Sequence, residues 1–230
     1  MHHVAVERWT RQKSALHRRD ARAKIGALLA FLIAVSTTDP QSQFGFLAYA
    51  LLLAIAILQA RLPVTPLLRR AALVVPFAAT FALITWWSGD RMRAIALPEK
   101  TFLSGLAALL LVATTPIPDL LRALEILRAP RLLVLVIHFL YRYLFVISEQ
   151  AQHMRLAAAS RGGLRFRSAA GVLAVLFTRS WERADGIYRA MLARGFSGQF
   201  PTMSRPDWHA ADALFFVLAA GASWAVRIAL

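Results

Sequence analysis

Cysteine is absent from the 230 residues, and acidic residues are scarce, with 12 Asp and Glu against 27 Lys and Arg. The first absence excludes a disulfide framework and a thiolate metal site. Residues 1–24 also lack a short apolar stretch followed by a small-residue cleavage site, so we expect no cleaved secretory signal. This basic arm is predicted to stay on the mature protein.

The chain also lacks the motifs of nucleotide and metal binding. No Gly-x4-Gly-Lys run followed by Ser or Thr occurs, so there is no loop of the kind that cradles the phosphates of ATP. The histidines have no compact ligand spacing, and the acidic residues do not cluster in the predicted spans. We expect no metal and no cofactor on this chain, and we interpret His2-His3 as part of a solvated terminus. The histidines are His2, His3, His17, His138, His153 and His209.

What the chain has in abundance is apolar sequence. Hydrophobic residues make up 58% of the total, in runs too long and continuous for the core of a soluble domain of this size. This predicts an all-α, polytopic membrane protein. The first and fourth runs are shorter than the ~20 residues that cross the bilayer, so we expect them to borrow flanking residues. The runs are 25–38, 44–60, 71–87, 101–115, 132–148 and 211–228.

The third apolar run carries two local signals. Pro76 removes a backbone donor, which predicts a kink in this helix. Trp86 and Trp87 close the run where an aromatic belt would lie at the membrane surface. The following residues, 88–90, read Ser-Gly-Asp and predict a turn.

Basic charge predicts how the chain is oriented. Lys and Arg lie between the apolar runs without the interleaved aromatics of a nucleic-acid stacking platform, so we attribute them to the positive-inside rule. If residues 132–148 cross the membrane as the fifth of six spans, nine arginines between Arg155 and Arg205 fall outside the cell. If that run lies at the interface and five others cross, 23 of the 27 basic residues are cytoplasmic. The second topology, with a cytoplasmic N-terminus, is therefore preferred.

His138 and Arg142 support an interfacial position for residues 132–148. An arginine at a helix centre costs at least ~2.5 kcal/mol on insertion scales, whereas an interfacial helix can turn it to water. The alternative is a spanning helix whose Arg142 is paired inside the bundle. The predicted organisation is a basic cytoplasmic arm (1–24), four transmembrane helices (25–115), a cytoplasmic or interfacial helical domain (116–205) and a last transmembrane helix (210–228).

The domain 116–205 is predicted to contain one short and two long helices. Asp119 is expected to cap the short helix, 120–128, and Pro130 to end it. The long helices are expected at about 131–161 and 168–194. Each is apolar in its first half and polar in its second, so the two share one plan.

Both long helices end in a related tripeptide, Ser160-Arg161-Gly162 and Ala193-Arg194-Gly195, thirty-three residues apart. One interpretation is helix termination, because glycine adopts the left-handed C′ conformation cheaply and arginine favours the negative end of the helix dipole. The other is docking, because a planar guanidinium near a membrane can grip a carboxylate, carbonyl or phosphate of a partner. The two interpretations are compatible.

The sequence resembles the transmembrane T components of energy-coupling factor (ECF) transporters, and among them the cobalt/nickel type called CbiQ. The resemblance is strongest over residues 116–201, which include Pro-Ile-Pro-Asp-Leu-Leu-Arg-Ala-Leu, Leu-Tyr-Arg-Tyr-Leu-Phe, Ser-Arg-Gly and Tyr-Arg-Ala-Met-Leu-Ala-Arg-Gly-Phe-Ser-Gly-Gln-Phe-Pro. The order of apolar runs also fits, so the resemblance covers nearly the whole chain. In that family two crossed coupling helices lie beneath the membrane, and their terminal Ala-Arg-Gly motifs dock into a pair of ABC ATPases.

The resemblance implies that Arg161 and Arg194 are the docking arginines and that Gly162 and Gly195 end the two helices. The second motif matches fully, whereas the first has Ser160 where the family has alanine. The implied partners are two ABC ATPases that bind the ATP, and a separate membrane subunit that binds the substrate. The implied function is a non-catalytic coupling subunit of a cobalt or nickel importer in a bacterial inner membrane.

Three other functions share some of these sequence features. A T component of a vitamin importer shares the same features, because the T component need not touch the substrate. A stand-alone secondary transporter is disfavoured because the clear spans contain no buried acid or broken-helix pair. A phosphatidyltransferase is disfavoured because Asp185-Gly186 is followed by no aspartate pair that could bind a divalent metal.

Overall fold

In the computed structural model described here, residues 9, 14–160, 166–196 and 208–229 are described, and within them every regular element is a helix. The prediction of an all-α polytopic bundle is confirmed. The chain divides into two compact units, Met1–Arg128 with Pro206–Leu230, and Ala129–Arg205. The helices are α2 (Ala21–Thr37), α3 (Gln43–Ala60), α4 (Val64–Ala72), α5 (Val75–Trp87), α6 (Arg91–Thr114), α7 (Ile117–Ile126), α8 (Arg131–Ser160), α9 (Phe166–Ala193) and α10 (Ala210–Ile228).

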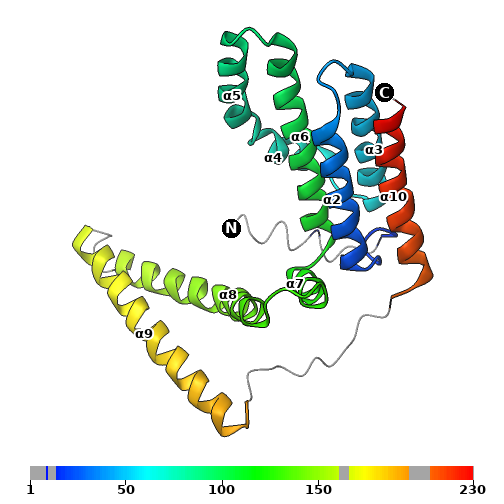
Figure 1. Cartoon of the computed structure of the whole chain (residues 1–230). Helices are drawn as coiled ribbons and strands as arrows, with labels where there is room; N and C mark the ends of the chain where they lie inside the picture. Colours follow the sequence, from blue (N-terminus) through cyan, green and yellow to red (C-terminus); the bar gives the residue numbers. More distant parts are fainter. Residues whose placement is uncertain (1–8, 10–13, 161–165, 197–207, 230) are drawn as a thin grey trace. The chain divides into compact units, whose positions relative to one another are not determined.

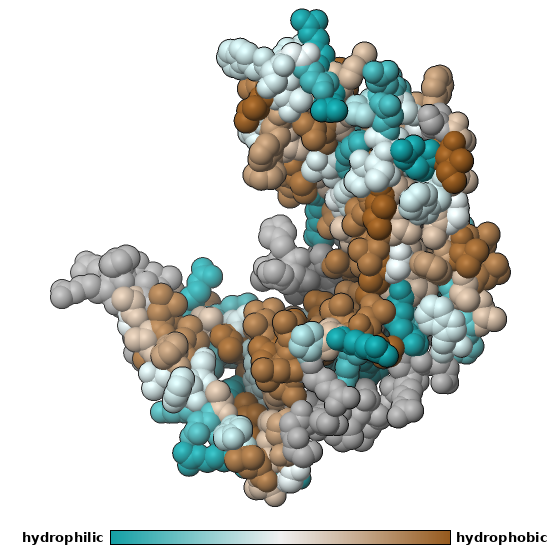
Figure 2. All heavy atoms as spheres, viewed as in Figure 1, coloured by the Kyte–Doolittle hydropathy of each residue, from teal (hydrophilic) through white to brown (hydrophobic). Residues whose placement is uncertain are grey.

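The first unit is a bundle in which α2 and α3 both pack against α6 and α10 (Figure 1). Its core is a continuous cluster of buried apolar residues from these helices and α4, in which Val35, Tyr49 and Leu67 are fully buried. The outer surface is also apolar: Phe44 is 81% exposed and Trp87 86% exposed. Figure 2 shows apolar side chains over the middle of this bundle, as expected for a surface that faces lipid.

Two lysines join α6 to the two ends of α2, which runs antiparallel to it. The Nζ of Lys24, in the first turn of α2, donates to the carbonyl of Thr114 at the end of α6 (3.0 Å). The Nζ of Lys100, in α6, donates to the carbonyls of Ser36 (3.0 Å) and Thr38 (2.7 Å) at the end of α2. The last carbonyls of a helix have no partner within it, and a cation there complements the helix dipole. Each lysine therefore stabilises the end of the neighbouring helix.

A close approach of α2 and α10 depends on Gly26. A Cβ atom at this position would lie 2.9 Å from Cε2 of Phe216 in α10, nearer than side-chain carbons pack. Only a residue without a side chain leaves the Phe216 ring where it is.

Polar contacts also fix the end of the bundle where the N-terminal arm enters; we call it the arm end. The backbone N–H groups of Asp20 and His209 donate to the Asp212 carboxylate, each at 3.2 Å. Burial raises the pKa of the Asp20 carboxyl, but the hydrogen bonds and charge of Arg22 outweigh it, so the pKa lies below its usual value. The arm end of the bundle is thus tied to the beginning of α10.

Helices α4 and α5 form one bent segment, with 43° between their axes. The kink predicted at Pro76 is present, but the break comes at Leu73 and Val74, and Pro76 lies in the first turn of α5. Proline is tolerated there because its missing N–H has no intrahelical acceptor. The predicted turn at residues 88–90 is confirmed, with Gly89 at φ +93°.

The short fourth run borrows flanking residues, as expected: helix α6 begins at Arg91, ten residues before that run. There the Asp90 side chain caps it by accepting from the N–H of Arg93 (3.1 Å). One predicted helix start was wrong. Asp119 does not cap the short helix α7. That helix begins at Ile117, with Pro116 at the N-cap and Asp119 in the first turn. Pro118 suits the first turn of a helix, so α7 begins before Asp119 and not after it.

By length and composition, four helices of the described chain could cross a membrane, or five if the bent α4–α5 pair is one span. They are α3, α6, α10 and the Leu132–Ser160 part of α8. Helix α2 has 17 residues and is shorter than the ~20 expected of a span. Helix α7 packs on α2 in the first unit, although the predicted domain 116–205 included it. The interfacial position of residues 132–148 stays a prediction.

Candidate functional site

The second unit is built around the two long helices, α8 and α9, which pack against each other near the end of α8 and the beginning of α9 and then spread apart (Figure 1). Pro130 starts α8, since its carbonyl accepts from the N–H groups of Leu133 (3.0 Å) and Val134 (3.2 Å). The observed bounds, Arg131–Ser160 and Phe166–Ala193, confirm the two predicted long helices to within two residues.

Helix α9 ends in a fully formed Schellman motif. The N–H of Gly195 donates to the carbonyl of Leu192 (3.0 Å), and the N–H of Phe196 donates to the carbonyl of Met191 (3.0 Å). Gly195 has φ +76°, in the left-handed region that glycine adopts at least cost. The prediction that Gly195 terminates this helix is therefore confirmed.

Arg194 lies at this terminus, between the last helical residue and the left-handed glycine. Its side chain and that of Ala193 are exposed. Among the residues that the structure describes, no carboxylate forms an ion pair with Arg194; the nearby Arg189–Asp185 pair (2.6 Å) lies further back on the helix and is exposed. The Arg194 guanidinium is thus presented to solvent at a rigid helix end.

At the other motif the structure reaches Ser160, the last residue of α8. Its hydroxyl donates to the carbonyl of Ala157 (2.9 Å), and its side chain is exposed. The predicted docking residues Arg161 and Gly162 lie outside the described residues.

The two predicted tips are far apart along α9. Ser160 and the start of α9 lie at the same end of the helix pair (Figure 1), whereas Gly195 ends α9. With 28 residues at ~1.5 Å each, α9 separates its two ends by about 42 Å. One compact binding groove does not extend over that distance, so two tips imply two separate contact points.

Helix α9 has two apolar stripes with different surroundings. One is half-buried: Val172, Leu176, Ile187 and Met191. The other is rotated by about a quarter turn and is exposed to between 51% and 71%: Leu173, Phe177, Trp181, Tyr188 and Leu192. An exposed apolar stripe of this length marks a surface that another molecule or the membrane covers.

Part of this exposed stripe was missed in the sequence. Apolar residues were expected only in the first half of α9, yet Trp181, Tyr188 and Leu192 extend the stripe to the Arg194 end. The signal was available, because these residues follow Phe177 at spacings of four, seven and four, which keep them on one helical face.

Among the described residues, no three His, Asp or Glu side chains are grouped so that they could hold a metal ion. Helices α8 and α9 instead combine exposed apolar side chains with an arginine-bearing helix end, which is the composition of a protein-docking surface.

These features define a class: a multi-pass membrane protein whose apolar bundle is joined to a pair of long helices with surfaces left uncovered. Residues 12–204 match the model of a protein family described as cobalt transport protein, CbiQ. The chain belongs to this family.

Individual relatives carry related names. The chain is 27% identical to the energy-coupling factor transporter transmembrane protein EcfT of Bacillus selenitireducens, over 85% of this chain and 84% of the relative. It is 30% identical to the cobalt transport protein CbiQ of Rhodobacter capsulatus, over 75% and 77%. An uncharacterized protein of Methanocaldococcus jannaschii is 32% identical over 42% of this chain, which spans only 38% of that protein's length.

Proposed function

We propose that this chain is the T component of an ECF-type importer, the membrane subunit that couples ATP hydrolysis on two partner ATPases to uptake by a separate substrate-binding subunit. Membership of the CbiQ family and the match to a protein named EcfT support this proposal. The observation that carries it is the exposed apolar stripe of α9, which runs to the exposed Arg194 at a Schellman end.

The two tips take the role of docking points for the ATPases. Arg194, with Ala193 and Gly195, meets one ATPase; Arg161, with Ser160 and Gly162, meets the other. The separation of about 42 Å along α9 suits two ATPase subunits better than one. An exposed guanidinium can bind carboxylates or carbonyls in a fixed orientation.

Between the tips, the apolar surfaces of α8 and α9 carry the motion. When the ATPases close on ATP, the tips move with them, and a helix transmits such a displacement along its axis as a rigid rod. The exposed apolar stripe then passes the movement to the substrate-binding subunit or the surrounding membrane. This chain binds no ATP and catalyses no reaction.

Cobalt is the proposed substrate of the complex, with nickel as the nearest alternative. The R. capsulatus relative is named for cobalt, and a 27% identical protein of Lactiplantibacillus plantarum, matched over 58% of this chain, is named a nickel permease. The ion is held by the substrate-binding subunit and not by this chain.

The N-terminus and the α8–α9 pair are placed on the cytoplasmic side of a bacterial inner membrane. The ATPases and their ATP are in the cytoplasm, and 23 of the 27 basic residues then lie on that side.

Copurification tests the proposal. The full chain carries an affinity tag and is co-expressed with the genes that neighbour its own. We expect two nucleotide-binding subunits and one further membrane subunit to elute with it. In proteoliposomes this complex should take up radioactive cobalt only when ATP is supplied to the ATPase side. Cobalt uptake by the isolated chain, without ATP or partners, would instead identify a secondary transporter and reject the proposal.

A further inference from the structure

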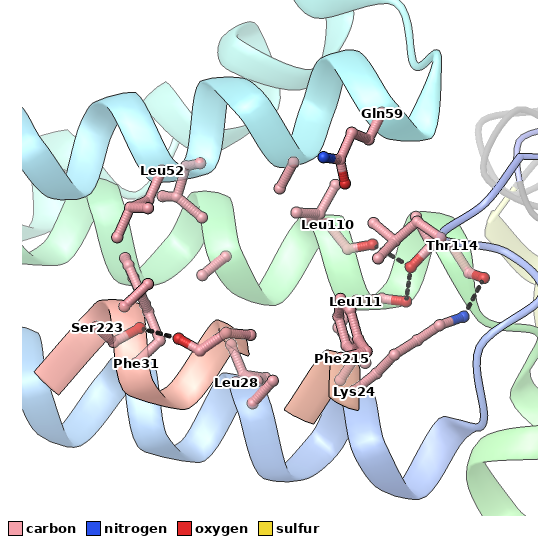
Figure 3. A pocket seen from close by; sticks show the side chains of 17 residues that line it. Lys24, Leu28, Phe31, Leu52, Gln59, Leu110, Leu111, Thr114, Phe215 and Ser223 are labelled. Carbon is pink, nitrogen blue, oxygen red and sulfur yellow. Dashed lines mark hydrogen bonds between the residues drawn. The ribbon is translucent and has the colours of Figure 1, made fainter. Parts of the chain in front are cut away.

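An apolar cavity of about 170 Å³ lies within the first unit, among α2, α3, α6 and α10. Figure 3 looks into it, with α3 above, α6 behind and α2 below. An engineered cavity of ~150 Å³ stays dry and binds benzene, so this one has room for about six methylene groups. At the end away from the arm, the Tyr49 hydroxyl donates to the carbonyl of Ser223 (3.4 Å) and joins α3 to α10.

The side of the cavity between α3 and α10 is only partly covered. Leu52 and Ala56 on α3 and Phe215 and Ala219 on α10 line it, and all four are half-buried. In a membrane, a flexible hydrocarbon chain can enter through this side.

The one charged side chain that lines the cavity has its ammonium group at one end, held by neutral acceptors. Lys24 points to the arm end of the cavity (Figure 3), where its Nζ donates to the Thr114 carbonyl (3.0 Å) and the Thr115 hydroxyl (3.2 Å). Away from this end the cavity is lined mainly by Leu, Ala and Phe side chains, so its interior suits an apolar occupant.

Next to the arm end of the cavity lies a basic groove, lined by Ser14, Ala15, Arg18, Leu58, Gln59 and Arg61. Gln59 lines both the groove and the cavity, so the two lie next to each other. Among the described residues, no acidic side chain forms an ion pair with Arg18 or Arg61. A cationic groove opening beside an apolar slot is complementary to an amphipathic anion.

The backbone at Arg61 supports a role for its side chain. Arg61 is the C-cap of α3 and has φ +55°, a left-handed conformation that disfavours residues with a Cβ. Glycine would satisfy the same cap with less strain. A guanidinium is thus held beside the groove at a conformational cost.

We propose that the groove and cavity bind one anionic phospholipid, with its phosphate on Arg18 and Arg61 and part of one acyl chain in the cavity. The apolar slot alone gives no preference over the bilayer, because lipid tails are as apolar as leucine. Selectivity therefore comes from the arginines, which bind phosphate and favour a negatively charged headgroup. This site depends on the membrane location of the chain and not on the coupling role proposed above.

Native mass spectrometry of the full chain in mild detergent tests this site. The chain is titrated with equal amounts of phosphatidylglycerol and phosphatidylethanolamine of the same acyl composition. We expect the anionic lipid to bind about thirtyfold more tightly, since each of the two arginines near the headgroup contributes about one kcal/mol. Arg18→Gln/Arg61→Gln should remove this preference. Arg91→Gln/Arg93→Gln makes the same charge change at the beginning of α6, away from the groove, and should keep the preference.

Two further variants separate lipid binding from folding. Arg61→Gly relieves the left-handed strain, so it should raise the melting temperature of the lipid-free chain while weakening phosphatidylglycerol binding. Ala56→Phe fills the slot and should weaken both lipids without changing their ratio. Melting curves and gel filtration verify that each variant is folded.

Equal binding of the two lipids by the parent chain would overturn the proposal. So would an equal loss of preference in the Arg91/Arg93 control, which would indicate attraction by net charge alone. A third contrary result involves a chain that lacks residues 2–13. If the full chain binds neither lipid and the shortened chain binds phosphatidylglycerol, the arm itself occupies the groove.

Discussion

Lys24 makes the contacts of a residue on which the bundle depends. Its Nζ donates to the Thr114 carbonyl and the Thr115 hydroxyl, and the residue is only 5% exposed. Lys24→Met keeps the length of the side chain but leaves a buried carbonyl without its donor. We expect the free energy of unfolding to fall by about 1–3 kcal/mol, measured by thermal unfolding in detergent.

Arg19→Met is the matched control for Lys24→Met. The Arg19 side chain is 33% exposed, and its nearest carboxylate oxygen, in Asp212, is 4.0 Å away. Such a pair contributes less than about 1 kcal/mol, so this variant should unfold close to the parent temperature. Equal destabilisation by the two variants would contradict the assigned role of Lys24.

Gly26 gives a second residue-scale prediction. Gly26→Ala forces the Phe216 ring aside and should destabilise the chain by about 1 kcal/mol, because overpacking an interface strains both helices. In a Phe216→Ala background the same substitution should be neutral or stabilising. The double-mutant cycle measures this coupling by chemical unfolding. Gly221→Ala, where a Cβ meets nothing within 4 Å, is the control.

Residue roles were predictable where the signal was local. Gly195 was identified from the end of an apolar pattern, and the structure gives it the positive φ that such a position requires. The contact between Lys24 and Thr114 was not predictable, because the partners are 90 residues apart in sequence. From the sequence, Lys24 was simply one of the basic residues of the arm.

At the scale of a helix, the Schellman end of α9 can be tested with two glycines of the same helix. Gly195→Ala meets no neighbour, so its cost is conformational and should be about 1 kcal/mol, through fraying of the last turn. Gly186→Ala, in the middle of α9 and equally free of neighbours, should stabilise the helix by a similar amount. Hydrogen exchange of residues 190–196 measures both effects; faster exchange in Gly186→Ala would be the contrary result.

Helices were predicted well where they begin and end at strong local signals. Pro130 and Gly195 bound the α8–α9 pair, and both long helices were placed to within two residues. The first residue of α6 was not predicted, because Pro98 and the charged Glu99 and Lys100 separate the apolar run from the residues before it. Hydropathy reports where a helix is apolar, not where it starts; the Asp90 cap sets that.

At the scale of the whole molecule, the absence of cysteine allows the topology to be mapped directly. Single cysteines at the exposed positions Ala15, Ser88 and Gln152 can be labelled with a membrane-impermeant maleimide. In intact cells we expect labelling at Ser88→Cys alone, with Ala15→Cys and Gln152→Cys reacting only after permeabilisation. Labelling of Gln152→Cys from outside would mean that residues 132–148 span the membrane.

The family and the helical architecture could be predicted from sequence because both rest on long, repeated patterns. Surfaces between distant segments could not: α7 was grouped with the long helices, yet it packs on α2. The cavity and its basic groove combine residues from Ser14 to Ser223, and no local pattern brings these together. Such features depend on how helices pack, which hydropathy does not encode.

The central claim is that Arg161 and Arg194 dock this chain onto two ATPases. The most direct measurement is the amount of ATPase that copurifies with Arg161→Glu/Arg194→Glu, compared with Arg179→Glu/Arg183→Glu, which makes the same charge change at exposed sites within α9. We predict that the first variant inserts normally but loses its ATPases and ATP-driven cobalt uptake, whereas the second keeps both. Parental ATPase recovery and uptake in the Arg161→Glu/Arg194→Glu variant would contradict the claim.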